Sequence, residues 1–208
     1  MISVSTSFVD VSAQIFTFAG RLAAAARVFT LPQLARHPQV SWRGHPIERA
    51  REFLKPHRDA FETVPWLDGH PHLWRLTEAY KRAHGLCYRN VGASQRTAHW
   101  LSFGDLYMQL VFNGIRPEKW FTEGRKIGGF DVYIQCKGVP HLVEVQNTPL
   151  SERQWHQKWK LREEWLTAQK WRPKVVLVTT KPMRIHKPDW VTAIDITNAH
   201  HAFRVPTK

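Results

Sequence analysis

Two acidic residues lie inside strongly apolar stretches of the sequence. Asp131 is the second residue of the run 130–137, and Glu144 stands in the middle of the run 141–147, two residues before Gln146. Strand alternation puts Glu144 and Gln146 on one face, and if the two runs pair, Asp131 can project from the same side. Two carboxylates held close together repel each other, and they become stable when a hard divalent cation lies between them. The spacing therefore predicts a metal site near the end of a strand pair.

Each acid also has a purely structural interpretation. Asp131 follows two glycines and could simply cap the turn that begins a strand. Glu144 is flanked by apolar residues, and a carboxylate is seldom buried without a partner. An ion pair with Lys158 or Lys137 would satisfy Glu144 without any metal.

The elements that must position these acids follow one another from residue 95 onward. Helical spacing and an Asn113-Gly114 stop predict a helix over 96–114. Three strands are expected next, with a tight Lys137-Gly138 turn between the second and the third. The helix that follows is expected to be capped by Ser151, with Gln154 at the capping-box position. The ranges expected for the strands are 119–125, 130–137, 141–147, 174–180 and, marginally, 190–197, and the second helix is expected over 151–171. The fourth strand is nearly all apolar, which indicates a central and parallel position in the sheet.

An Asp followed after twelve residues by Glu-x-Gln, in this order of elements, resembles the PD-(D/E)XK nuclease superfamily. The segment "VEVQNTPLSERQW" resembles the nuclease segment of competence protein CoiA. Over a longer span, "HLWRLTEAYKRAHG", "TAHWLSFGDLYMQL" and the strand pair are similar to the replication-relaxation family of plasmid and phage proteins. The sequence departs from the superfamily in carrying Gln146 where lysine is commonest, and in having no proline before Asp131.

This resemblance implies an α/β fold with a restriction-endonuclease-like αβββαβ core. It implies that Asp131 and Glu144 are ligands of Mg²⁺ or Mn²⁺, together with the backbone carbonyl of Val145. Glu123 would complete the acidic cluster, or would lie exposed on an edge strand. The reaction implied is metal-assisted hydrolysis of a phosphodiester.

Two further site residues are implied on the strand and on the helix that follows. Gln146 would orient the attacking water or a phosphate oxygen. Lys158 lies four residues after Gln154, on the same helix face, and could supply the missing cation. The structural alternative for Lys158 is a solvated helix residue.

The N-terminal part of the chain has a different pattern. Three helices are expected over 10–30, 30–38 and 47–61, followed by a β-hairpin around Asp68-Gly69. This is the order of a winged helix-turn-helix, whose third helix enters the major groove of DNA. The basic residues of that helix, expected to contact DNA, are Arg49, Arg51, Lys55 and Arg58. A small helical domain with a solvated charged face is the alternative. We therefore expect a DNA-binding domain over 1–92 and a nuclease-like domain over 93–208.

Charge and composition favour an anionic partner. The 208 residues carry 30 Lys and Arg against 17 Asp and Glu, a formal net charge of +13, and both halves of the chain are basic. Such a surface most often meets nucleic acid, so we expect DNA as the partner.

Two distant cysteines suggest neither a disulfide framework nor a zinc site and fit a reducing cytoplasm, and no apolar stretch is long enough to span a membrane. A homodimer is plausible for an enzyme that cuts both strands of a duplex.

Two functions of different classes follow from the sequence. The first is a Mg²⁺-dependent DNA endonuclease with an attached winged-helix domain, acting in plasmid or phage DNA replication, recombination or processing. The second is a catalytically inactive DNA-binding or replication-control protein that keeps the nuclease fold. An RNA-binding module is the least favoured reading.

Overall fold

The computed structural model describes residues 8–37, 44–64, 73–92, 96–122, 127–169 and 172–204, with side chains from residue 12 onward. The chain divides into two compact units, Met1–Gly104 and Asp105–Lys208. The division falls inside one helix, α5 (Thr97–Phe112), which contributes residues to both units. None of the described helices is long and apolar enough to cross a membrane.

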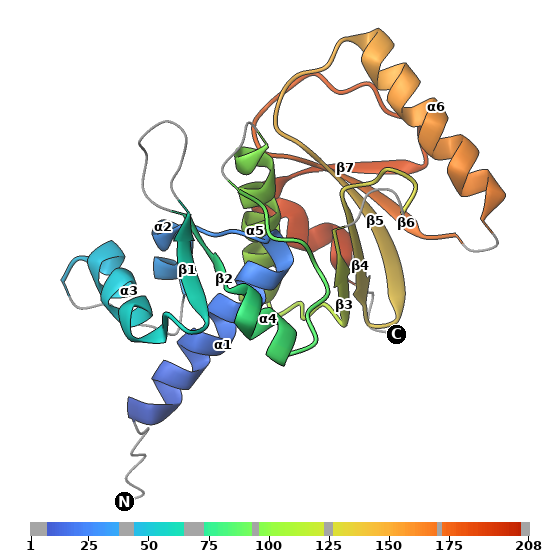
Figure 1. Cartoon of the computed structure of the whole chain (residues 1–208). Helices are drawn as coiled ribbons and strands as arrows, with labels where there is room; N and C mark the ends of the chain where they lie inside the picture. The colour runs from blue at the N-terminus through green and yellow to red at the C-terminus, as the bar shows by residue number, and fades with distance from the viewer. Residues whose placement is uncertain are drawn as a thin grey trace, which may run out of the picture. The chain divides into compact units, whose positions relative to one another are not determined.

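The first unit combines one long helix and several short ones with a small two-stranded sheet (Figure 1). Its elements are α1 (Phe8–Ala26), α2 (Leu31–Ala35), α3 (Pro46–Leu54), the 3₁₀ turn η1 (Lys55–His57), β1 (Phe61–Val64), β2 (Leu73–Leu76) and α4 (Glu78–Ala83). The two strands pair antiparallel from Phe61 opposite Leu76 to Val64 opposite Leu73. The expected strand pairing is confirmed, whereas the Asp68-Gly69 turn lies outside the described residues.

Local signals in the sequence explain where the helices of this unit begin. Thr30 and Gln33 form the capping box of α2, with Pro32 in the first turn, where a missing N–H costs nothing. Pro56 falls in η1, directly after α3, because proline cannot continue an α-helix without removing a hydrogen bond. The short helix expected over 30–38 is therefore confirmed as α2, whereas the third helix, expected over 47–61, ends at Leu54.

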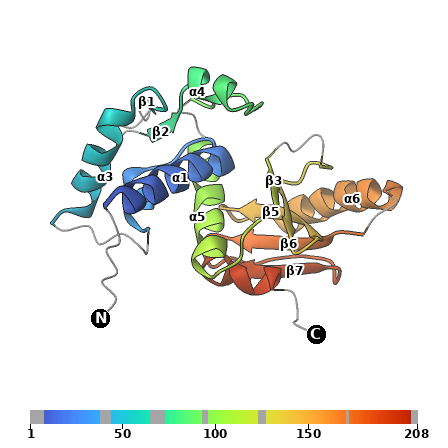
Figure 2. The same ribbon diagram turned by 90° about the horizontal axis from the view of Figure 1, so that it is seen from below.

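The second unit is built on a five-stranded mixed sheet in the order β3-β4-β5-β6-β7 (Figures 1 and 2). Its elements, beyond the last part of α5, are β3 (Lys119–Phe121), β4 (Val132–Cys136), β5 (Val139–Gln146), α6 (Glu152–Ala168), β6 (Lys174–Thr179), β7 (Val191–Asp195) and the 3₁₀ helix η2 (Ile196–Phe203). The first three strands are antiparallel neighbours, and β6 and β7 run parallel to β5. Five strands at the expected places, the Ser151–Gln154 capping box and the parallel fourth strand are confirmed. The first strand, expected over 119–125, is seen over Lys119–Phe121, and residues 123–125 lie outside the described residues.

Turn chemistry fixes the register of the central strand pair. Lys137 and Gly138 have φ of 47° and 74°, the two left-handed residues that a two-residue hairpin needs. The turn places Val132 opposite Val143. The N-terminal end of β4 therefore meets the C-terminal end of β5.

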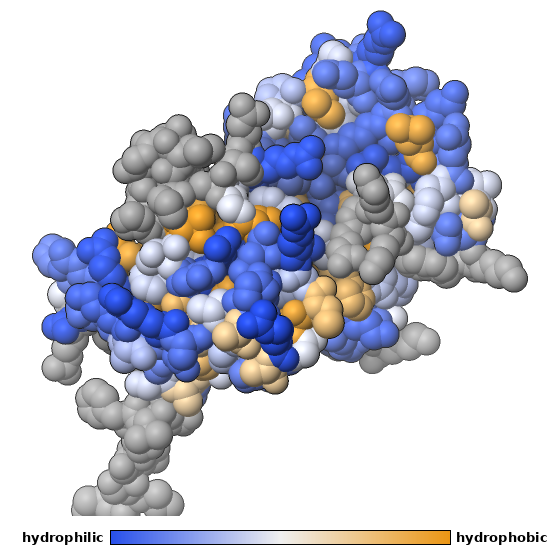
Figure 3. All heavy atoms as spheres, viewed as in Figure 1, coloured by the Kyte–Doolittle hydropathy of each residue, from blue (hydrophilic) through white to orange (hydrophobic). Residues whose placement is uncertain are grey.

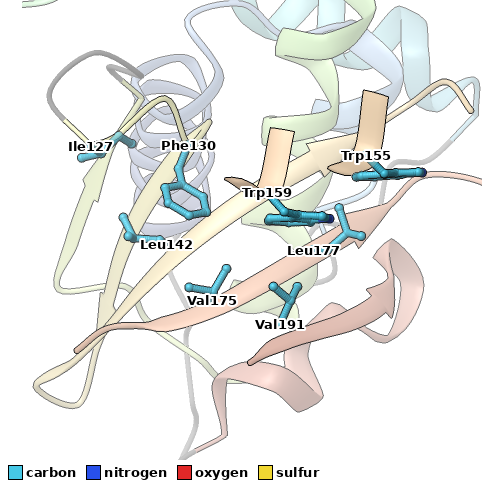
Figure 4. Close-up of a cluster of buried hydrophobic side chains, with 8 residues drawn as sticks. All are labelled: Ile127, Phe130, Leu142, Trp155, Trp159, Val175, Leu177 and Val191. Atoms are coloured by element: carbon cyan, nitrogen blue, oxygen red, sulfur yellow. The ribbon is translucent and has the colours of Figure 1, made fainter. Parts of the chain in front are cut away.

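The core of the second unit lies between α6 and one face of the sheet (Figure 4). Trp155 and Trp159 stack with ring centroids 5.9 Å apart, and they pack over residues of β5 and β6 such as Leu142 and Leu177. Two buried indoles on successive turns hold α6 in a fixed rotation about its own axis. On β5, alternation puts His141 on the opposite face from Leu142, and there it meets Phe203 of η2.

The expectation of an α/β fold is confirmed at the level of a mixed sheet with helices. The second unit shows the order helix, three strands, helix, two strands. The restriction-endonuclease-like core, the winged helix and the division at residues 92 and 93 stay predictions.

Candidate functional site

The site predicted from the two acids lies where the N-terminal end of β4 meets the C-terminal end of β5, inside the five-stranded sheet. Asp131 directly precedes β4 and bonds to both chain neighbours of Glu144. Its backbone N–H donates to the carbonyl of Val143 at 3.0 Å, and its Oδ2 accepts from the N–H of Val145 at 2.8 Å. The side chain of Asp131 is half-buried. These two hydrogen bonds hold Asp131 beside Glu144, and through its side chain Asp131 also bonds the start of β4 to β5.

Glu144 is a buried carboxylate with two cationic partners, both from α6. Only 3% of the residue is exposed. Its Oε1 forms an ion pair with Lys158, and its Oε2 accepts from Nε and Nη2 of Arg162 at 3.0 and 2.7 Å. The partner expected from the sequence was Lys158 or Lys137; the structure has Lys158 together with Arg162. The alternative of a structural ion pair therefore describes the geometry of Glu144 as it stands.

The electrostatic balance at Glu144 is unfavourable to its charge despite these partners. Burial, followed by the negative charge of Asp131, raises the pKa of Glu144 to about 7, although Lys158 and Arg162 act in the opposite direction. Desolvation disfavours the ionised form, and a neighbouring carboxylate adds to that effect. A further cation beside the two acids would stabilise the ionised form.

Gln146 and Lys158 meet at the same site. Lys158 Nζ donates to Gln146 Oε1 at 2.8 Å, and Gln146 Nε2 donates to the carbonyl of Thr148 at 2.6 Å. Lys158 also lies 5.5 Å from the centroid of the Trp155 ring. Gln146 is buried and the Lys158 side chain is 19% exposed, so Lys158 is not a solvated helix residue. A single ammonium group therefore links the Gln146 amide and the Glu144 carboxylate.

Two glycines shape the turn that leads into Asp131. Gly128 and Gly129 have φ of 67° and 79°, a region that favours glycine. A Cβ added to Gly128 would lie 2.3 Å from the Trp165 ring, so this position needs glycine on steric grounds as well. The carbonyl of Gly129 accepts from Arg162 Nη2 at 2.6 Å. Arg162 thus ties the turn before Asp131 to the Glu144 carboxylate.

These residues fit a hard divalent cation in the chemistry of their donors. Asp131 and Glu144 offer carboxylate oxygens, which Mg²⁺ and Mn²⁺ prefer. Val145, expected to contribute its carbonyl, stands between Glu144 and Gln146 on β5. Glu123 lies outside the described residues. Within the described part of the chain, no group of three His, Cys, Asp or Glu could hold a metal, so the acidic cluster there is a pair.

The residues expected to contact DNA lie on α3 and the turn after it. All four side chains, Arg49, Arg51, Lys55 and Arg58, are exposed. Lys55 forms an ion pair with Glu52 at 2.6 Å, and Glu48 lies in the first turn of the same helix. Figure 3 shows a hydrophilic surface over α3. The charge of this helix is therefore mixed, with basic side chains in excess.

Sequence reasoning missed Arg162, which makes three hydrogen bonds at the site, to Glu144 and to the Gly129 carbonyl. Lys158 makes two polar contacts there, to Glu144 and Gln146. A signal was present, because Arg162 lies four residues after Lys158 and so on the same helix face. Its partners are 18 and 33 residues away in the chain, and that distance hides the pairing from local patterns.

Comparisons with known proteins do not assign a family. No family model matches the sequence, and no curated protein matches it. Among solved structures, the chain is similar to protein VC1899 from Vibrio cholerae, with 11% identity and a TM-score of 0.30. The alignment covers 92% of this chain and 51% of that one, so the chain spans about half the length of that protein. A likeness this weak carries no argument about fold family or function.

Proposed function

We propose that this protein is a metal-dependent DNA endonuclease whose active site lies where the N-terminal end of β4 meets the C-terminal end of β5. The observation that carries the proposal is the attachment of Asp131 to both neighbours of Glu144, with a lysine and a glutamine amide at the same site. The net charge of +13 supports DNA as the substrate. The PD-(D/E)XK resemblance of the sequence agrees with this assignment but is a separate argument.

This proposal assigns a role to each residue of the site. Asp131 and Glu144 would hold a Mg²⁺ or Mn²⁺ ion, which neutralises charge on the phosphate undergoing attack. Lys158 would leave Glu144 when the ion binds and would place its ammonium group beside the phosphate. Gln146 would keep its hydrogen bond to Lys158 and would orient that group or the attacking water. Arg162 would hold Glu144 and the Gly129 turn in place, acting as a positioning residue.

A specific observation favours the second candidate, a DNA-binding protein without catalysis. The carboxylate of Glu144 already forms ion pairs with Lys158 and Arg162, so it has cationic partners without a metal. Buried ion pairs of this kind occur in proteins as purely structural features. The two candidates therefore differ in whether the site binds a divalent ion.

Supercoiled plasmid incubated with the protein and Mn²⁺ or Mg²⁺ tests the proposal. We expect nicking that disappears with EDTA and in the variants Asp131→Asn and Glu144→Gln. Arg153→Ala is a suitable control, because Arg153 is an exposed cation in the first turn of α6. Nicking that is absent from the wild type, or that survives in both acid variants, would contradict the nuclease assignment and leave the DNA-binding candidate.

A further inference from the structure

The connection between β6 and β7, residues 180–190, begins beside the candidate site. The backbone N–H of Thr180 donates to the carbonyl of Gln146 at 3.2 Å. Since β5 and β6 are parallel, Thr179 pairs with Gln146 and both strands end at the same edge of the sheet. The residues that follow Thr180 therefore leave the fold next to Gln146.

This connection is strongly basic. Lys181, Arg184 and Lys187 are all exposed, and none forms an ion pair with another residue that the structure describes. The sequence contains no acidic residue between Glu164 and Asp189. Three cations within seven residues, without acids among them, give a local positive potential that attracts a polyanion. In Figure 3 the surface of this unit over the neighbouring α6 is mainly hydrophilic.

The connection has no regular secondary structure, yet it is fixed to the fold at several points. The carbonyl of His186 accepts from Trp159 Nε1 at 2.9 Å, and the side chain of Ile185 packs against the core under α6. At its end, the N–H of Val191 donates to the carbonyl of Pro188 at 3.1 Å. These contacts hold the main chain that carries the three cations against the fold, and such restraint reduces the entropy lost on binding.

We propose that the β6–β7 connection binds the phosphodiester backbone of duplex DNA through Lys181, Arg184 and Lys187. Lys181 directly follows Thr180, which is hydrogen-bonded to Gln146, so Lys181 would hold a phosphate beside the cleavage site. Arg184 and Lys187 would hold phosphates further away. The statement that Lys181 holds a phosphate beside a cleavage site rests on the proposed function. The phosphate contacts themselves do not depend on cleavage.

Salt-dependent binding tests this proposal with the full chain. Fluorescence anisotropy of a labelled DNA duplex would be titrated at several NaCl concentrations in EDTA, so that no cleavage takes place. The test variant is Lys181→Ala/Arg184→Ala/Lys187→Ala. The control is the triple variant of the exposed lysines Lys119, Lys137 and Lys174, at the opposite edge of the sheet. Both variants lose three positive charges, from two lysines and an arginine in the test variant and from three lysines in the control, so the change in net charge is the same and its location differs.

We expect the slope of log K against log salt to become shallower by about 2–3 in the test variant, because each lost phosphate contact removes about 0.9 from the slope. The control should change the slope by less than about 1 by the same counterion argument. Equal changes in the two variants, or an unchanged slope in the test variant, would overturn the proposal.

The same proteins separate this proposal from the nuclease assignment. Suppose that wild type does not nick plasmid, and that the test variant but not the control has a shallower slope of log K against log salt. The nuclease assignment then fails and the β6–β7 phosphate contact stands. If wild type nicks plasmid through Asp131 and the test variant keeps its slope, the nuclease stands and the β6–β7 contact fails.

Discussion

Removing Arg162 should destabilise the second unit in a way that depends on pH. The guanidinium donates twice to Glu144 and once to the Gly129 carbonyl, and it lies 5.2 Å from the Phe130 ring centroid. Arg162→Ala removes all these contacts and leaves a buried carboxylate with Lys158 as its remaining described ion-pair partner. Breaking a buried pair from one side costs about 3–5 kcal/mol. Because Lys158 remains, we expect a loss near the lower limit, about 3 kcal/mol at pH 8.

The sign of the pH dependence follows from the raised pKa of Glu144. The folded protein holds a proton on Glu144 at pH values where the unfolded chain, with a pKa near 4.5, has released it. Stability from this group is therefore lost as pH rises from about 4.5 toward the folded pKa of about 7. Without Arg162 the folded pKa rises further, so the penalty should be smaller at pH 5.5, where Glu144 can take up a proton, than at pH 8.

Urea unfolding followed by tryptophan fluorescence at pH 5.5 and pH 8 measures both effects. Arg153→Ala, an exposed arginine on the same helix, should change stability by less than about 0.5 kcal/mol at either pH. A loss below about 1 kcal/mol for Arg162→Ala, or an equal loss at both pH values, would show that the pair with Glu144 does not stabilise the fold as described.

Three further outcomes are expected. Gly128→Ala should destabilise the protein by more than Gly138→Ala in thermal unfolding: both glycines have positive φ, but only at Gly128 does an added Cβ meet the Trp165 ring, at 2.3 Å. Equal losses would refute the steric argument. Lys81→Met should cost about 1–3 kcal/mol in urea unfolding, because the buried ammonium donates to a backbone carbonyl at 2.7 Å, and an unchanged midpoint would contradict this. Mn²⁺ should raise the melting temperature more at pH 8 than at pH 5.5, since metal and proton compete for Glu144; an equal or reversed effect would exclude that competition.

Much of the second unit could be predicted because its signals are local. The Lys137-Gly138 turn, the Ser151 cap and the alternation along β4 and β5 each depend on a few neighbouring residues. These signals set the register, and the register brings Asp131 to the neighbours of Glu144.

Other features depend on contacts between distant segments, which a single sequence does not reveal. Arg162 finds its partners only once α6 lies on the sheet, and that rotation is fixed by Trp155 and Trp159. Lys81 reads as a solvated charge in the sequence, yet it is 1% exposed because Glu78 and the Tyr88 carbonyl satisfy its ammonium group. The short helix that carries Lys81, α4, was not predicted because six residues give too little periodicity to recognise.

Titration of the metal-free protein with Mn²⁺, followed by electron paramagnetic resonance of the free ion, tests the central claim most directly. If Asp131 and Glu144 share a cation, wild type should bind Mn²⁺ at a site that Mg²⁺ displaces, and Asp131→Asn or Glu144→Gln should each abolish that binding while the fold persists. Wild type that binds no Mn²⁺, or variants that bind it as wild type does, would contradict the claim.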